Sequence, residues 1–410
     1  MFSHSLFSKI IKKSTSSFLH HLLPRLTLHR TFVDARIKWV RDPFLDFAVE
    51  LEKNLCHCCS LKNLLLSSPS YSLPISIASL HKPHLNLPSH TTALYFFHRY
   101  PSLFTLSPPN VKLTPQFLTL HKEEQEIHDS MLQKESAVQR LVRLLMIARS
   151  CRIPVSVIDD LKFDLCLPDN YVLDFVSYYP EYFRLCKLKS REIGDVGSDT
   201  ENLGGFEVGL ELIKWRKELG VPMILRKECD DDMGCRKGRT VNFPMNFPPG
   251  FDLQKKVKDW VDEWQCLPYI SPYEDAFHLA PRSDQAEKWT VAVLHEILSL
   301  LVSKKTKMRN ILRLGDYLGF GLRFEKAIVH HPGIFYVSNK IKTQTVVLRE
   351  AFRKDRLLEN HPLVGMRHRY LYLMNKSRKG RKPVKNLSSG YGLQMSRSDS
   401  DRGTKCVSEE

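Results

Sequence analysis

The segment "RYPSLFTL" (residues 99–106) ends an apolar helical run with a tyrosine and a proline, and then alternates between apolar and polar residues. Similar segments return as "YYPEYFRL" (178–185) and "HHPGIFYV" (330–337). In each copy a phenylalanine follows the proline by three positions, and an apolar residue follows it by five. Proline disfavours the α conformation of its predecessor, and residues two apart on an extended chain share a face. Each copy therefore predicts a helix, a proline corner and a short strand.

Helical periodicity dominates the rest of the chain from Asp42 onward. Asp42 as N-cap and Pro43 as first helical residue favour a helix start. Its expected buried face consists of Phe44, Phe47, Ala48, Leu51 and Leu55. Further helices are expected within 91–100, 136–149, 154–165, 169–179 and 255–265, and a strand is expected from Phe206.

Helices this short cannot bury an apolar face alone, so neighbouring elements must stack on them. The three proline corners are 79 and 152 residues apart, which excludes a solenoid of fixed period. We expect a mainly α fold with short β-strands (α+β). It should be elongated and built of quasi-repetitive helical modules that end in proline corners.

The first 33 residues contain five Lys or Arg, nine Ser or Thr and no acidic residue. Residues 1–33 are therefore predicted to be an organellar transit peptide, with a disordered basic tail as the alternative. Phe2, Leu6 and Ile10 lie at helical spacing opposite lysines, which favours the mitochondrion, whereas the serine content keeps the chloroplast as an alternative.

The remaining chain is predicted to comprise one domain at 34–374, with polar loops at 187–205 and 228–240, and a disordered basic tail at 375–410. No segment is apolar over the roughly 18 residues that a membrane span requires, so we expect no membrane association.

The formal net charge is +16, from 61 Lys plus Arg and 45 Asp plus Glu. Residues 301–385 contain 21 basic and 5 acidic residues, an excess of 21 − 5 = 16, so the rest of the chain balances at 40 against 40. One basic region on a neutral scaffold favours a polyanionic partner, and nucleic acid is the commonest one. The alternative is a solvated charged face.

Aromatic residues alternate with the basic ones in this region, namely Phe324, Phe335, Tyr336, Phe352 and Tyr370. Cations bind phosphates, and exposed aromatic rings stack on unpaired bases, which suits single-stranded or folded RNA. The alternative is that the aromatic residues form the core. The predicted RNA-binding residues are Lys304, Lys305, Lys307, Arg309, Arg313, Arg323, Lys326, Lys340, Lys342, Arg349, Arg353, Lys354, Arg356, Arg367, Arg369 and Tyr370.

Motifs for catalysis are missing from the sequence: it has no Walker lysine motif, no complete dinucleotide fingerprint, no GxSxG and no HExxH. The cluster "CHCC" (56–59) lacks a second ligand pair at zinc-site spacing. Asp230, Asp231 and Asp232 could hold a divalent ion for nuclease chemistry, but adjacent carboxylates in a polar loop are usually solvated. We expect no enzyme activity, no catalytic residue, no metal site and no cofactor.

Four longer motifs carry a family resemblance. They are "LVRLLMIARSCRIPVSVIDDLKFDLCLPDNYVLDFVSYYPEYFRL" (141–185), "KVKDWVDEWQCLPYISPYEDAFHL" (256–279), "EKWTVAVLHEILSLLVSKKTKMRNI" (287–311) and "HPGIFYVSNKIKTQTVVLREAF" (331–352). From about Arg36 to Met374 the chain resembles the plant organellar RNA recognition (PORR) family, also called the what's-this-factor family.

The resemblance implies a nuclear-encoded plant protein that is imported into an organelle and binds intron RNA without known catalysis. Such proteins promote splicing of group II introns together with other splicing factors in a ribonucleoprotein particle. Alternatives are an organellar nucleic-acid binder of the mTERF type, a structural protein associated with the organellar ribosome, and a metal-dependent nuclease.

Overall fold

The computed structural model describes residues 39–376 except 69, 81–90, 190–204, 229–240, 248–250, 252 and 342. The predicted transit peptide, the three loop aspartates 230–232 and nearly all of the predicted tail lie outside the described residues. Most of each predicted loop lies outside them too. At the described edges of these segments, residues 187–189 belong to a strand, and residues 375–376 end the last helix.

Three copies of one module recur along the described chain, and each consists of a strand, two helices and a β-hairpin. The first contains β1 (Ser72–Pro74), α4 (Ile75–Leu80), α5 (Ala93–Arg99), β2 (Phe104–Ser107) and β3 (Asn110–Leu113). The second contains β4 (Arg152–Pro154), α8 (Val155–Leu165), α9 (Tyr171–Tyr178), β5 (Phe183–Lys189) and β6 (Phe206–Leu212). The third contains β7 (Lys305–Lys307), α13 (Met308–Leu318), α14 (Leu322–His330), β8 (Phe335–Ser338) and β9 (Thr345–Leu348). The helices that precede the modules are α3 (Leu55–Leu66), α7 (Met131–Ile147) and α12 (Asp284–Leu300).

The modules agree in topology and in backbone detail. Their antiparallel sheets have the orders β1-β3-β2, β4-β6-β5 and β7-β9-β8. The phenylalanine of each proline corner pairs with a leucine of the last strand, as Phe104 with Leu113, Phe183 with Leu212 and Phe335 with Leu348. The residue before each first strand has a left-handed conformation, namely Tyr71, Cys151 and Lys304, with φ of 50°, 53° and 53°.

The predicted proline corners are therefore confirmed. Each corner phenylalanine begins a strand and is buried, whereas the apolar residue two positions later is half-buried or exposed. Of the second members, Leu106 and Val337 pack against the edge of a core, and Leu185 is exposed. The expected fold class, mainly α with short strands, is also confirmed.

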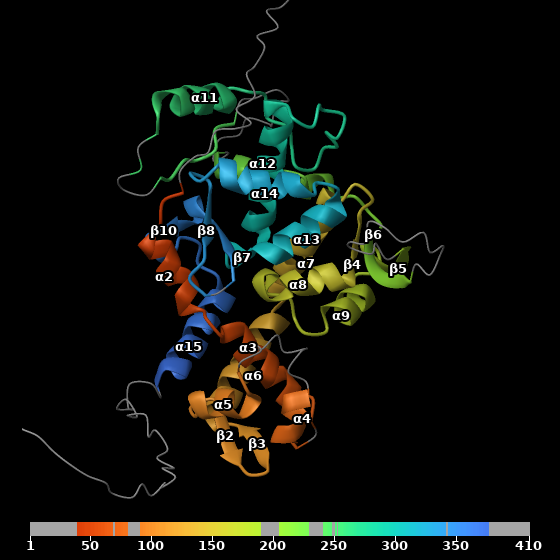
Figure 1. The fold of residues 1–410 in the computed structure, drawn as a ribbon. Helices are drawn as coiled ribbons and strands as arrows, with labels where there is room; N and C mark the ends of the chain where they lie inside the picture. The colour runs from red at the N-terminus through yellow and green to blue at the C-terminus, as the bar shows by residue number, and fades with distance from the viewer. Residues whose placement is uncertain are drawn as a thin grey trace, which may run out of the picture.

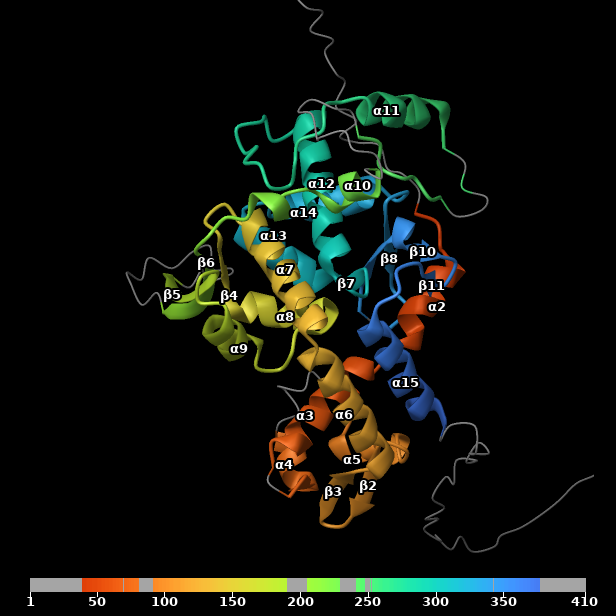
Figure 2. The same cartoon turned by 180° about the vertical axis from the view of Figure 1, so that it is seen from behind.

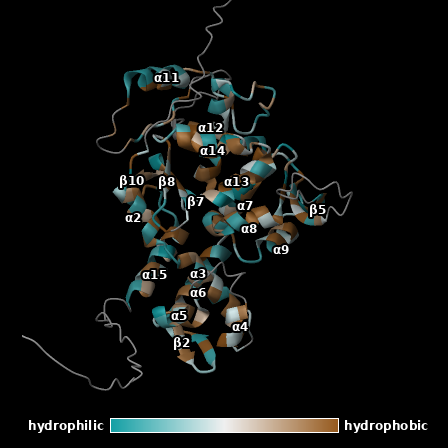
Figure 3. Cartoon of the chain, in the orientation of Figure 1, coloured by the Kyte–Doolittle hydropathy of each residue, from teal (hydrophilic) through white to brown (hydrophobic). Residues whose placement is uncertain are grey.

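The modules form two lobes (Figure 1). The second and third modules share one core with α7 and α12, to which α10 (Met223–Glu228) and α11 (Lys255–Gln265) also contribute. The first module forms a smaller lobe with α6 (Pro115–Asp129) and α15 (Pro362–Lys376). Figure 3 shows hydrophobic and hydrophilic segments alternating along α11 and α13, as expected for helices with one buried face.

Helices α6 and α15 connect the lobes in different ways. Helix α6 leads into α7 with only Ser130 between them, and Figure 2 shows α6 in the smaller lobe and α7 in the larger one. Helix α15 packs through Leu363 against Cys166 and Val302 of the larger lobe. Further along the same helix, Tyr370 lies in the core of the smaller lobe. The last helix therefore returns to the first module.

Most of the remaining elements lie beside the third module. They are α2 (Pro43–Leu51), the hairpin of β10 (Phe352–Arg353) and β11 (Arg356–Leu357), and the short helix η2 (Arg349–Ala351). The short helix η1 (Lys217–Leu219) instead follows the second module, where Arg216 at its start lies 5.0 Å from the ring centroid of Tyr182. Figure 1 shows α2 next to β8 and β10, although hundreds of residues separate them in the chain.

The face predicted for the first helix is confirmed at Ala48 and Leu55, which are buried, and is wrong at its other three residues. The segment forms two helices, α2 and α3, because Asn54 adopts a left-handed conformation with φ of 70°. Phe44, Phe47 and Leu51 are exposed, whereas Asp46 is buried among Leu45, Ala48 and Val49. The cause is a hydrogen-bond cluster in which Asp46 Oδ1 accepts from Tyr336 Oη at 2.9 Å and from Ser338 Oγ at 2.6 Å.

Because the two lobes have separate cores, the loss of a buried ring should loosen mainly the lobe that contains it. Phe104→Ala and Phe335→Ala should each lower the free energy of unfolding by about 3–5 kcal/mol, because both remove a buried ring. Native-state hydrogen exchange should show that Phe104→Ala loosens the smaller lobe first and Phe335→Ala the larger lobe. The exposed Leu185→Ala should change stability by less than about 0.5 kcal/mol. Equal loosening of both lobes by Phe104→Ala would contradict the division into two cores.

Candidate nucleic-acid interface

Five of the predicted RNA-binding residues are buried, namely Lys304, Lys305, Arg349, Arg367 and Tyr370. Lys305 Nζ lies 2.9 Å from Glu52 Oε1, and Arg349 Nη1 lies 2.8 Å from Asp42 Oδ2. Buried charges persist only when they are paired, so these side chains hold the fold together. Burial removes these five side chains from any surface that RNA could contact, contrary to their prediction as RNA-binding residues.

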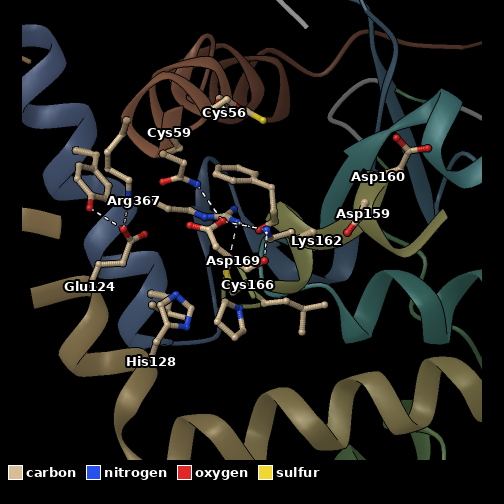
Figure 4. Close-up of a pocket in the computed structure, with 18 of the residues that line it drawn as sticks. Cys56, Cys59, Glu124, His128, Asp159, Asp160, Lys162, Cys166, Asp169 and Arg367 are labelled. Atoms are coloured by element: carbon tan, nitrogen blue, oxygen red, sulfur yellow. Dashed lines mark hydrogen bonds and ion pairs between the residues drawn. The ribbon is translucent and has the colours of Figure 1, made fainter. Parts of the chain in front are cut away.

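Arg367 occupies the junction of the two lobes. Its Nη2 donates to the Phe163 carbonyl and lies 3.3 Å from Cys166 Sγ, and Figure 4 shows this contact. Burial alone would lower the pKa of Arg367, but Cys166 and Glu52 outweigh that effect and raise it. Arg367 is therefore a fixed structural cation.

A cavity of about 260 Å³ lies at this junction, lined by side chains from α3, α6, α8, α13 and α15. Cys56 and Cys59 of the "CHCC" cluster line it (Figure 4). Burial raises the pKa of Cys59 to about 12 and also raises that of Cys56, so both remain protonated thiols at neutral pH. Among the residues that the structure describes, no group of three or more His, Cys, Asp or Glu side chains could hold a metal ion.

Three further predicted residues are paired at the surface or close to it. Arg313 Nη1 lies 2.5 Å from Asp160 Oδ2, and Lys340 Nζ lies 3.7 Å from Glu50 Oε2. Arg369 pairs with Glu123. Lys342 lies outside the described residues.

The other predicted cations are exposed or half-buried and have no ion-paired carboxylate within the described part of the chain. They are Lys307, Arg309, Arg323, Lys326, Arg353, Lys354 and Arg356. Lys307 and Arg309 lie at the edge of the junction cavity. Arg353, Lys354 and Arg356 lie together on the hairpin β10–β11.

The hairpin borders a larger depression of about 1380 Å³, which we call the hairpin groove. It lies between α2, the hairpin and α15, and its lining is Phe47, Leu51, Asp355, Arg356, Leu357, Glu359, Asn360, His361, Pro362, Val364, Gly365, His368, Leu371, Tyr372, Asn375 and Lys376. A second depression of about 540 Å³ between α15 and α6 shares His368, Tyr372 and Lys376 with it. Helix α15 is thus a ridge with hollows on both sides.

Of the five predicted aromatic residues, Phe352 lies near the free cations, because it precedes Arg353 on the hairpin and is half-buried. Phe324, Phe335, Tyr336 and Tyr370 are buried, as the alternative interpretation had it. The exposed rings are Phe47 and Tyr372, with Phe44 close to the hairpin because Lys354 Nζ lies 5.8 Å from its ring centroid. Helical spacing could have distinguished Tyr372 from Tyr370. The buried residues of α15 are 363, 366, 367, 370, 371, 373 and 374, and position 372 points away from the face centred on 363, 367, 370 and 374.

The family model of the plant organelle RNA recognition domain matches residues 40–379, which span all of the described elements. The chain belongs to this family. It is 32% identical to Protein WHAT'S THIS FACTOR 9, mitochondrial, of Arabidopsis thaliana, over 86% of this chain and 88% of that protein. It is 28% identical to Protein WHAT'S THIS FACTOR 1, chloroplastic, of Zea mays, over 82% of this chain and 66% of that protein.

A further relative is Protein ROOT PRIMORDIUM DEFECTIVE 1 of Arabidopsis thaliana, at 29% identity over 82% of each chain. No solved structure matches the chain. None of the described helices is both long enough and apolar enough to cross a membrane.

Glu124 connects three helices of the smaller lobe beside the junction cavity. Its carboxylate accepts hydrogen bonds from Lys62 Nζ on α3 and, at 2.8 Å, from Tyr370 Oη on α15 (Figure 4). Burial alone would raise the pKa of Glu124, but His121 and Lys62 lower it to about 2. The carboxylate is therefore charged over the whole physiological pH range.

Glu124→Gln should lower the free energy of unfolding near pH 7 by about 3 kcal/mol, because it leaves the buried Lys62 ammonium without a counter-ion. The carboxyl titrates near its ordinary pKa of 4.5 in the unfolded chain and near 2 in the folded chain. Its contribution is thus present above about pH 4.5 and is lost as the pH falls toward about 2. Urea unfolding at a series of pH values should show wild type and variant converging as the pH falls. A constant difference would contradict this assignment. The control is Glu123→Gln, which removes a half-buried neighbour paired with Arg369 near the surface and should cost far less, because ion pairs near the surface contribute little to stability.

Proposed function

We propose that this protein binds organellar RNA and promotes splicing of group II introns in plant mitochondria. The observation that carries the proposal is the match of the RNA recognition domain along residues 40–379. The relative with a mitochondrial name matches nearly the whole chain and supports that compartment over the chloroplast, which remains the alternative.

The free cations support a polyanionic partner. Arg353, Lys354 and Arg356 present three positive charges on one short hairpin, and no carboxylate pairs with them in the described part of the chain. Such a group binds phosphates and releases counter-ions from the nucleic acid. Exposed aromatic rings lie beside it, as in proteins that bind unpaired RNA.

The protein acts by binding and not by catalysis, and the intron RNA supplies the reacting groups. Stabilising one RNA fold over its competitors by about 3 kcal/mol shifts their ratio about a hundredfold. Other splicing factors join the protein on the same RNA in a ribonucleoprotein particle.

Crosslinking the protein to RNA in isolated mitochondria, followed by sequencing of the attached RNA, tests the function. Group II intron sequences are the expected result. Ribosomal RNA as the main product would instead indicate a ribosome-associated structural protein, and organellar DNA would indicate a binder of the mTERF type. Loss of the protein should leave the crosslinked introns unspliced, while the abundance of their precursors is maintained.

The hairpin cations should account for part of the salt dependence of binding. Combined Arg353→Gln, Lys354→Gln and Arg356→Gln substitutions should weaken binding of intron RNA and reduce the slope of log affinity against log salt by up to about 2. Thermal unfolding should be unchanged, because these side chains are exposed.

A matched control removes the same charge elsewhere. Lys255, Lys256 and Lys258 are exposed on α11, which Figures 1 and 2 both show at the far end of the molecule from α15. Their combined replacement by Gln should leave most of the salt slope in place. Equal effects of the two triple variants would show that only net charge matters and would remove the hairpin from the interface.

A further inference from the structure

Two large aromatic side chains in the hairpin groove are exposed to solvent. Phe47 on α2 is 51% exposed, and Tyr372 on α15 is 73% exposed. Both line the same depression, although they are 325 positions apart in the chain, so the fold itself brings them together. Large exposed apolar surface at one place indicates a binding site.

Cations flank these rings in the same groove. Arg356 and Lys376 line it at the hairpin and at the end of α15. Of the two carboxylates in the lining, Glu359 has Oε2 2.6 Å from Lys304 Nζ, so its charge is balanced within the protein. The other, Asp355, lies in the turn of the hairpin, where three cations outnumber it. The groove therefore combines apolar ring faces with positive charge that the protein leaves available.

The size and lining of the groove limit what can occupy it. Its volume of about 1380 Å³ exceeds the roughly 300–1,000 Å³ typical of small-molecule pockets, so a polymer fits better than a metabolite. Leu51, Leu357 and Leu371 add apolar surface between the rings and the cations. An RNA duplex hides its base faces within the stack, whereas an unpaired strand offers both base faces and phosphates.

We propose that the hairpin groove binds unpaired nucleotides of RNA. Phe47 and Tyr372 stack on exposed bases, and Arg356 and Lys376 contact the adjoining phosphates. The inference rests on the proposed function and deepens it, because it names the RNA conformation that is recognised and the residues that recognise it.

Fluorescence anisotropy with the full chain tests the proposal. The probes are a labelled single-stranded RNA of mixed sequence, the same sequence closed into a duplex, and a complete group II intron RNA. The single strand should bind more tightly than the duplex. Tyr372→Leu and Phe47→Leu should each weaken single-strand binding about tenfold without changing the salt slope, because stacking neutralises no phosphate. Tyr372→Phe should keep the affinity of the wild type.

Tyr178→Leu is the matched control, because Tyr178 is also 73% exposed, and Lys134 Nζ lies 6.0 Å from its ring centroid. It lies on α9, outside the groove, and should leave RNA binding unchanged. Melting curves by circular dichroism should confirm that all variants fold.

Two results would overturn the proposal in distinguishable ways. In the first, the intron RNA still binds, but Tyr372→Leu and Phe47→Leu bind the single-stranded RNA with the affinity of the wild type. The groove then does not stack on bases, while the proposed function stands. That outcome is also expected if a protein partner occupies the groove. If the wild type binds none of the three RNAs at low salt, the proposed function fails as well.

Discussion

Buried ion pairs between the first helices and the last third of the chain hold this molecule together. Glu52, at the end of α2, lies 2.9 Å from Lys305 Nζ and 3.8 Å from Arg367 Nη1. Burial alone would raise the pKa of Glu52, but the two cations lower it, so the carboxylate stays charged. Breaking such a pair leaves a buried charge and costs about 3–5 kcal/mol. Glu52 and Lys305 are 253 positions apart, so the pair links distant parts of the chain and fixes α2 against the third module.

The same link also forms the hairpin groove. One wall comes from the start of the chain through α2, and the others come from its end through the hairpin and α15. The ion pair of Arg349 with Asp42 holds α2 at its other end. The buried charges are thus structural, while their exposed neighbours on the hairpin remain available to a partner.

The sequence predicts the parts of the fold that depend on local sterics. At Pro101, Pro180 and Pro332, the proline ends a helix through its effect on the preceding residue, and a strand follows. This effect is local, so the three corners could be recognised from short segments of sequence. The exposed face of α2 could not be predicted in this way. Asp46 is buried because Tyr336 and Ser338, 290 and 292 positions away, donate to it. The basic region of residues 301–385 could not be divided from the sequence for the same reason. Several of its cations pair with carboxylates on distant helices, as Arg313 does with Asp160, and only the structure shows these pairs.

The left-handed residue before the first strand of each module, at Tyr71, Cys151 and Lys304, shows where each module stores backbone strain. A non-glycine residue in that conformation costs roughly 1 kcal/mol or more. Each of the three donates its backbone N–H to the carbonyl three positions earlier, so the same tight turn leads from the preceding segment into the strand. Every module thus carries a local cost at its entrance that the packing of its own helices and sheet has to offset.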